Sequence, residues 1–241
     1  MKVAIHQPHY FPWIGYFDKL AKADQFILLD EVQFEKGSQM IRNRVLDSQG
    51  NIKYLTIMGE TKGFLGKQYK DLQTKENAVW KKRQIDALEN YYRKARCKEE
   101  ALEIINKFFA SDYSTICEWT CNSIRLMCQL LEIKTKIVLQ SEISYDNGRK
   151  KSELVLSLCE AVKADTYVSG RGASVNYLNR EEFQDRGIAI EFQEFVHPIY
   201  RQVQSEVFVP GLSILDMLFN LGVKEMHDVF WEQYSIQASV I

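Results

Sequence analysis

Two histidines near the amino terminus, His6 and His9, have the residue type and spacing to handle an anionic group. An imidazole can donate a hydrogen bond, accept a proton or ligate a metal ion near neutral pH. Pro8 and Pro12 stiffen the backbone around them, because a proline ring fixes φ, so this loop holds its side chains at set angles. We therefore predict a ligand site in the loop at residues 6–16.

The elements around this loop are those of an open α/β sheet. A short apolar strand is predicted at residues 3–5, a helix at 14–23 and a second apolar strand at 25–29. Open α/β sheets place ligands at the carboxyl ends of their strands. Asp30 directly follows the second strand, and His6, His9 and Asp30 are the catalytic candidates. A metal site built from these three is an alternative, although no ligand spacing specifies it.

The spacing of the two histidines is similar to the HxGH element of nucleotidyltransferase-type α/β proteins. In that element both imidazoles contact phosphates and stabilise charge on the phosphoryl group in transfer. Pro8 stands here in the place of the glycine. A structural role for the two histidines is the alternative interpretation.

A second candidate is the loop Ser169-Gly170-Arg171, which follows a short strand predicted at residues 165–169. Glycines let backbone amides close on an anion, and an arginine can pair with phosphate or carboxylate. A plain strand-exit loop with a solvated arginine is the alternative. Two further groups are predicted to lie near this edge of the sheet: a basic rim of Lys36, Arg42 and Arg44, and a polar, aromatic loop containing His197 and Tyr200.

The remaining periodicity predicts the architecture. A hairpin is expected around the turn at residues 47–51, and further strands are expected at 134–140 and 188–192. Helices are expected at 151–164 and at 212–220, the latter closed by Gly222. We predict one α/β domain spanning residues 1–241, with a mostly parallel, Rossmann-like (nucleotidyltransferase-like) sheet, a β-hairpin and a predominantly helical insertion at about 77–131.

Composition excludes several classes of protein. The 241 residues carry a formal net charge of -1 and are 46% hydrophobic, which favours a packed core and gives no overall field for nucleic acid. No apolar run has the length of a membrane span or a signal peptide. The five cysteines show no paired CxxC spacing and are expected to be buried free thiols of a cytoplasmic protein.

The loop at residues 6–16, together with several other blocks along the chain, resembles the WbqC-like family. The similarity covers nearly the whole chain and is most specific in the first block. The matching blocks are HQPHYFPWIGYFDK at 6–19, Asp24, DEVQF at 30–34, RNR at 42–44, YVSG at 167–170, YL at 177–178, HPIY at 197–200 and LSILDMLFNLG at 212–222.

This resemblance implies an enzyme of bacterial surface-polysaccharide (O-antigen, lipopolysaccharide) precursor synthesis. The implied transferase acts on a nucleotide-activated sugar or amino sugar, by nucleotidyl, acyl or aminoacyl transfer. A non-catalytic nucleotide-sugar-binding or scaffold protein is the alternative. The candidate cofactor is a nucleotide with Mg²⁺, and the sequence does not specify an oligomeric state. The expected substrate-binding residues are Gln7, Tyr10, Trp13, Lys19, Gln33, Arg42, Asn43, Arg44, Ser169, Gly170, Arg171, His197 and Tyr200.

Overall fold

The computed structural model describes residues 1–34, 38–60, 64, 66–75, 79–172 and 174–238. Its contacts divide the chain into two compact units. Unit 1 comprises residues 1–7, 16–32 and 134–195, and unit 2 comprises residues 8–15, 33–133 and 196–241. The predicted single domain is not tested by this division and stays a prediction.

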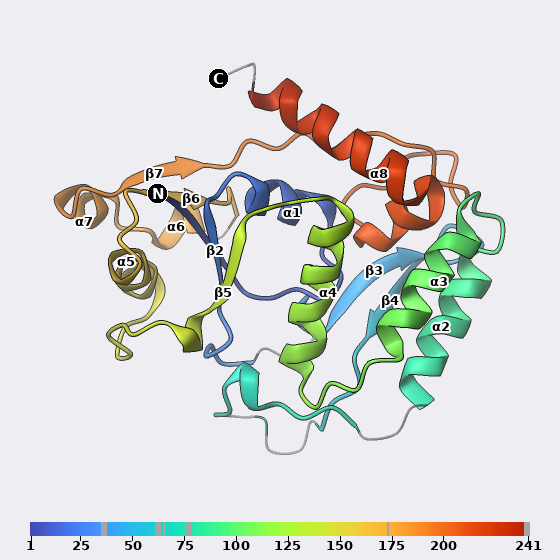
Figure 1. Cartoon of the computed structure of the whole chain (residues 1–241), viewed down its shortest axis with the longest axis horizontal. Helices are drawn as coiled ribbons and strands as arrows, with labels where there is room; N and C mark the ends of the chain where they lie inside the picture. Colours follow the sequence, from blue (N-terminus) through green and yellow to red (C-terminus); the bar gives the residue numbers. More distant parts are fainter. Residues whose placement is uncertain (35–37, 61–63, 65, 76–78, 173, 239–241) are drawn as a thin grey trace. The chain divides into compact units, whose positions relative to one another are not determined.

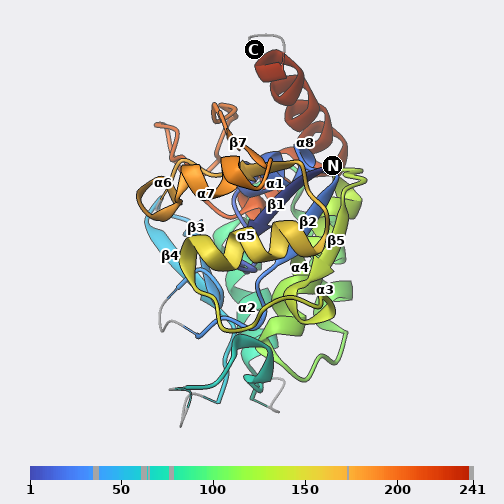
Figure 2. The same cartoon turned by 90° about the vertical axis from the view of Figure 1, so that its left-hand side faces the viewer.

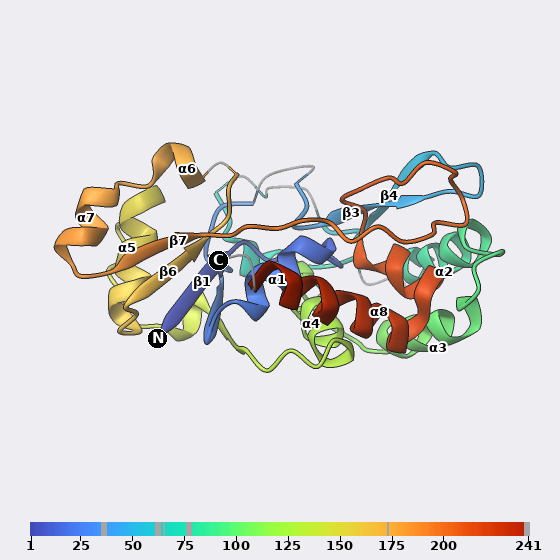
Figure 3. The same cartoon turned by 90° about the horizontal axis from the view of Figure 1, so that it is seen from above.

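Unit 1 is built on a five-stranded sheet in which every paired strand is parallel. The strands are β1 (Lys2–His6), β2 (Gln25–Leu28), β5 (Lys136–Leu139), β6 (Thr166–Ser169) and β7 (Ala189–Phe192). Their order across the sheet is β5-β2-β1-β6-β7, which is the Rossmann order, and Figure 3 shows β7, β6 and β1 side by side. The α/β class and the mostly parallel sheet are thus confirmed.

Helices cover both faces of this sheet. The unit contains α1 (Ile14–Ala21, from Tyr16 onward), α5 (Lys151–Ala161), α6 (Ser174–Tyr177) and α7 (Arg180–Asp185), with a 3₁₀ turn at Gln140–Glu142. Strand side chains alternate between faces. Ile5 and Ile27 pack with α5 and with Phe183 of α7, the face that Figure 2 shows in front. Phe26 points the other way and contacts Tyr16 of α1, with ring centroids 5.3 Å apart.

Unit 2 combines the antiparallel hairpin with a set of helices. Its elements are β3 (Arg42–Leu46), β4 (Ile52–Thr56), a 3₁₀ turn at Tyr69–Asp71, α2 (Val79–Tyr91), α3 (Lys98–Phe109), α4 (Ile116–Leu130) and α8 (Ile214–Ala238). Figure 1 shows α2 and α3 side by side. The separate hairpin and the helices of the predicted insertion are therefore present, although residues 77 and 78 of that insertion lie outside the described residues.

Local sequence explains the ends of two of these helices. Thr115 and Glu118 form a capping box at the start of α4, in which the side chain of each residue accepts a hydrogen bond from the backbone N–H of the other. Gly222 has φ +77 and divides α8 into two helical segments. The predicted end of the first segment is confirmed, and the helix from Val223 onward extends the fold beyond that prediction.

Candidate functional site

The candidate site lies at the carboxyl edge of the unit 1 sheet, where two of its strands stop pairing. β1 pairs with β2 as far as His6 and Leu28, but its register with β6 ends at Ala4 and Val168. Beyond that point β6 continues to pair with β7 alone, through Ser169. We call this feature the β1–β6 split: residues 5–7 on one side and residues 169–171 on the other. In the order β5-β2-β1-β6-β7, successive strands are added on one side of β1 up to β5 and on the other side from β6 onward. Open α/β folds bind ligands at such a reversal of strand order, which here lies between β1 and β6.

His6 is the last residue of β1 and is held in a defined orientation. Its Nδ1 lies 2.9 Å from the carbonyl oxygen of Gln7, and its ring meets the edge of Tyr16 with centroids 5.0 Å apart. The Tyr16 hydroxyl also donates to the Gln7 carbonyl, at 3.1 Å. Because a carbonyl only accepts, Nδ1 carries the proton in the neutral imidazole, and the lone pair is on Nε2. His6 can therefore act as a base or, when protonated, as a donor.

Asp30 follows β2 and is engaged by the chain that leaves β5. Its two carboxylate oxygens accept from the backbone N–H of Ser141 at 2.9 Å and from the Ser141 hydroxyl at 2.6 Å. The side chain is 1% exposed. Asp30 thus ties the exits of β2 and β5 together at the carboxyl edge, and its neighbour Glu31 accepts from Tyr145 at 3.0 Å.

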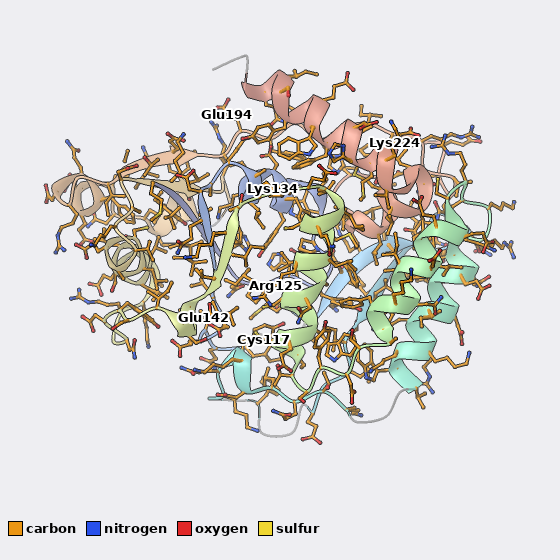
Figure 4. All side chains as sticks on the ribbon, in the orientation of Figure 1. Cys117, Arg125, Lys134, Glu142, Glu194 and Lys224 are labelled. Carbon is orange, nitrogen blue, oxygen red and sulfur yellow. The ribbon has the colours of Figure 1, made fainter. Side chains whose placement is uncertain are left out.

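The loop after β6 supplies the other side of the β1–β6 split. Ser169 is fully buried, and its hydroxyl donates to the Gly170 carbonyl at 3.2 Å. A methyl group added at Gly170 would have no neighbour within 4 Å, so the backbone there can be approached closely. The Arg171 guanidinium forms an exposed ion pair with Glu194, which is labelled in Figure 4 on the segment after β7.

Lys19 brings an amine to the same edge from α1. The side chain is 4% exposed, and its Nζ donates to the Ile5 carbonyl at 2.8 Å. Burial lowers the pKa of Lys19 to about 7, because an apolar environment disfavours the charged form. Next to it in sequence, the buried Asp18 carboxylate accepts from Gln193 and Lys22. Burial raises the pKa of Asp18, although these donors act against that rise.

The other predicted site residues, including the catalytic candidate His9, belong to unit 2. Several of them hold the fold together there: the Tyr10 hydroxyl donates to Gln84 at 3.0 Å, and Asn43 donates to the carbonyls of Tyr10 and Phe11 at 3.1 and 2.9 Å. Burial raises the pKa of Tyr10 well above its ordinary value. The structure places His9, Tyr10, Trp13, Gln33, Arg42, Asn43, Arg44, His197 and Tyr200 in this unit, and Lys36 lies outside the described residues.

The cationic and aromatic members of this set have partners within unit 2. Arg42 lies 4.4 Å from the centre of the Tyr54 ring, and Arg44 donates to the Gly211 carbonyl at 2.7 Å. Trp13 stacks on His197 with centroids 6.2 Å apart, and burial lowers the pKa of that histidine. The remaining predicted site residues belong to unit 1, around the carboxyl edge of its sheet: His6, Gln7, Lys19, Asp30, Ser169, Gly170 and Arg171.

Sequence reasoning missed a buried carboxylate cluster in unit 2. Asp216, in the first turn of α8, accepts from the hydroxyls of Tyr92 at 2.8 Å and Tyr200 at 2.7 Å, and from the Gln202 amide at 3.0 Å. One signal was available: an aspartate inside an apolar helical stretch is buried only when it finds donors. Its partners come from distant segments, so the sequence could not name them.

Two features are absent from the described residues: a cluster of metal-ligating side chains and a helix that could span a membrane. These residues contain no group of three or more histidine, cysteine, aspartate or glutamate side chains that could hold a metal ion. None of the described helices has the length and apolar character needed to cross a lipid bilayer.

Comparison with known proteins identifies a family and a relative of this chain. The model of the WbqC-like protein family matches residues 7–228. An uncharacterized protein of Mycobacterium tuberculosis is 31% identical over 225 residues, covering 92% of this chain and 95% of that protein. No solved structure matches the chain.

Proposed function

Since the chain belongs to the WbqC-like protein family, we propose that it is an enzyme of bacterial surface-polysaccharide precursor synthesis. The proposed substrate is a nucleotide-activated sugar or amino sugar, and the proposed reaction is the transfer of a nucleotidyl, acyl or aminoacyl group. O-antigen and other lipopolysaccharide components are the class of product.

One observation supports this proposal: His6 and the loop at residues 169–171 follow neighbouring strands at the point where β1 and β6 stop pairing. His6 ends β1, and Ser169, Gly170 and Arg171 leave β6. A nucleotide sugar carries a pyrophosphate, whose oxygens are acceptors for backbone amides, imidazolium and guanidinium. Ligands of open parallel sheets bind outside the carboxyl ends of the strands at such a point.

Each residue has a distinct role in the proposed site. His6, with Nδ1 held by the Gln7 carbonyl, offers Nε2 as a base toward the attacking group or, once protonated, as a donor to the phosphoryl oxygens. Arg171 exchanges Glu194 for a phosphate at small cost, because an exposed ion pair contributes only about 0–1 kcal/mol. Mg²⁺ would accompany the nucleotide and neutralise part of the charge on its phosphate oxygens.

Binding measurements test the proposal directly. Isothermal titration with UDP-N-acetylglucosamine, GDP-mannose and dTDP-glucose identifies the sugar nucleotide that binds. We expect His6→Ala and Arg171→Ala each to weaken that binding by about tenfold or more. Arg186→Ala is the matched control, because Arg186, directly after α7, also forms an exposed ion pair, with Glu160 of α5. Unchanged affinity in both site variants would contradict the proposal.

A second candidate function is favoured by the state of Asp30. Both of its oxygens accept from Ser141, so this carboxylate serves the fold before it can orient a substrate or a metal ion. A non-catalytic nucleotide-sugar-binding protein of a glycan assembly system needs no such carboxylate. Product analysis separates the two candidates, since consumption of a bound sugar nucleotide with any amine or acyl donor excludes the purely binding protein.

A further inference from the structure

The amine of Lys19 occupies a particular place in the backbone hydrogen-bonding of the unit 1 sheet. In a parallel strand, successive carbonyls point to opposite neighbours. The His6 carbonyl accepts from Leu29 on the β2 side, so the Ile5 carbonyl points toward β6. The register of β1 with β6 has ended one rung earlier, at Ala4 and Val168. The Ile5 carbonyl accepts instead from Lys19 Nζ at 2.8 Å, which places this amine in the β1–β6 split.

The direction of the Lys19 side chain follows from helix geometry. Long side chains on a helix lean back toward its amino terminus. In a β-α-β unit the helix begins at the carboxyl edge of the sheet and runs back along it, so a residue in the second turn of α1 reaches the end of β1. The Lys19 side chain thus points toward the sheet edge where ligands bind, and not toward the solvent-exposed face of α1.

The hydrogen-bonding capacity of this amine is only partly used. Within the described part of the chain, Nζ has one acceptor, the Ile5 carbonyl, although an ammonium can donate to several acceptors at once. A buried charged group without further acceptors is costly. An anion at the β1–β6 split would supply the missing acceptors.

Other charged groups near the strand ends have their own partners. Burial lowers the pKa of Lys19 to about 7. The ionisable groups of the surrounding elements are engaged as follows: Asp18 with Lys22 and Gln193, His6 with the Gln7 carbonyl, Asp24 with the Lys2 amide, Asp30 with Ser141, Arg171 with Glu194, and Glu191 with Lys2.

We propose that Lys19 contacts the ligand: its ammonium donates to a phosphate-class oxygen of an anion seated at the β1–β6 split while keeping its bond to the Ile5 carbonyl. This inference rests on the proposed function and names the group that binds the pyrophosphate of the sugar nucleotide. The free site then holds a partly neutral amine near pH 7, and the arriving anion draws a proton onto it, because an opposite charge favours the ammonium.

A pair of variants tests the contact. Lys19→Met removes the ammonium and keeps the length of an unbranched apolar side chain. Lys2→Met removes a lysine charge from the amino end of β1, where it pairs with Glu191. We expect Lys19→Met to bind the sugar nucleotide identified above about tenfold to hundredfold more weakly, and Lys2→Met to bind as the unchanged chain does. Inorganic sulfate, tested beside it, shows whether the anion alone is recognised, and its affinity should fall in the same variant.

Proton uptake provides a test on the unchanged chain. A pyrophosphate diester does not titrate near neutrality, so calorimetry in buffers of different ionisation enthalpy counts the protons taken up by the protein. We expect the uptake of the unchanged chain to exceed that of Lys19→Met by close to one proton at about pH 8 and by close to none at about pH 6. Equal uptake by the two chains at about pH 8, or unchanged affinity in Lys19→Met, overturns this inference alone. Failure of the unchanged chain to bind any of the three sugar nucleotides overturns the proposed function and this inference with it.

Discussion

The carboxylate of Asp216 and the hydroxyl of Tyr200 lie 2.7 Å apart in the interior of unit 2. The same carboxylate accepts from Tyr92 at 2.8 Å and from Gln202 at 3.0 Å, so one buried acid joins α8 to the end of α2 and to the segment that precedes α8. Burial raises the pKa of Asp216, and the three donors act against that rise. This cluster therefore contributes a pH dependence to the stability of the fold.

The first prediction concerns the sign of that dependence. A carboxyl group whose pKa is raised by folding stabilises the native state in acid, and this contribution is lost as the pH rises through the raised value. The free energy of unfolding of the unchanged chain, minus that of Asp216→Asn, should therefore fall as the pH rises above about 4, the ordinary pKa of an aspartate. Urea denaturation at several pH values measures it. A difference that grows with pH would contradict the prediction.

The second prediction concerns Lys19 and stability. The pKa of Lys19 falls from 10.5 to about 7 on folding, so its buried charge costs stability below about pH 7, and this cost is relieved as the pH rises toward 10.5. Lys19→Met should raise the free energy of unfolding at about pH 6 by a few kcal/mol and by less at about pH 9. The exposed Lys2→Met is the control, which should change stability little at either pH.

Together with the ligand measurements, this would make Lys19 a residue that weakens the fold and serves the site. Functional groups are often destabilising in this way. A loss of stability in Lys19→Met that is the same at both pH values would instead assign the side chain a packing role.

The third prediction concerns Asn43, whose amide holds the carbonyls of Tyr10 and Phe11. Phe11 has φ +38, a conformation that residues other than glycine rarely adopt, so this turn depends on its hydrogen bonds. Asn43→Ala should lower the free energy of unfolding by about 2–3 kcal/mol, because two buried carbonyls lose a donor.

Chemical denaturation measures this loss, with Asn122→Ala as control, since among the described residues the Asn122 amide donates to the Glu118 carbonyl on its own helix and to no other acceptor. Hydrogen exchange of the Arg44 amide, which donates to Asn43 Oδ1 at 2.8 Å, should accelerate in the variant. Unchanged stability with weakened ligand binding would favour the substrate-binding role that the sequence suggested for Asn43.

The fourth prediction concerns the division of α8 at Gly222. A methyl group at this position would lie 2.5 Å from Glu100 Oε2 and 2.9 Å from Cys97 Sγ, on a backbone with φ +77. Gly222→Ala should destabilise the chain by about 2 kcal/mol or more, through strain and contact together. Gly187→Ala isolates the strain, because Gly187 has φ +68 and no neighbour within 4 Å of the added atom. Equal losses in the two variants would show that the contacts at Gly222 relax without cost.

The sequence predicts the strands well because their signals are local. The apolar run before His6 and the one before Asp30 became β1 and β2, and the turn at 47–51 became the hairpin of β3 and β4. Gly222 gave the end of the first part of α8, since only a residue at ease with positive φ fits there.

The relations between distant segments were beyond the sequence. Periodicity shows that Asp216 lies in a helix, but its three donors come from residues 92, 200 and 202, which only the folded chain brings near. The division into two units, with the loop at residues 6–16 shared between them, also depends on contacts remote in sequence. Lys19 shows both sides of this limit. The resemblance named it among the binding residues, but only the folded chain shows that this helical lysine is buried and donates to the Ile5 carbonyl.

The pairing of β2 with β5 has a consequence for how the chain folds. Residues 33–133 of unit 2 lie between these neighbouring strands in the sequence. During synthesis, β1 and β2 emerge first, and β2 keeps an open edge until the whole intervening segment has been made. Pairings of such high contact order form slowly, because the ends of a long loop must first meet. Pulse-labelled hydrogen exchange during refolding should accordingly find the helices of unit 2 protected before the amides that join β2 to β5.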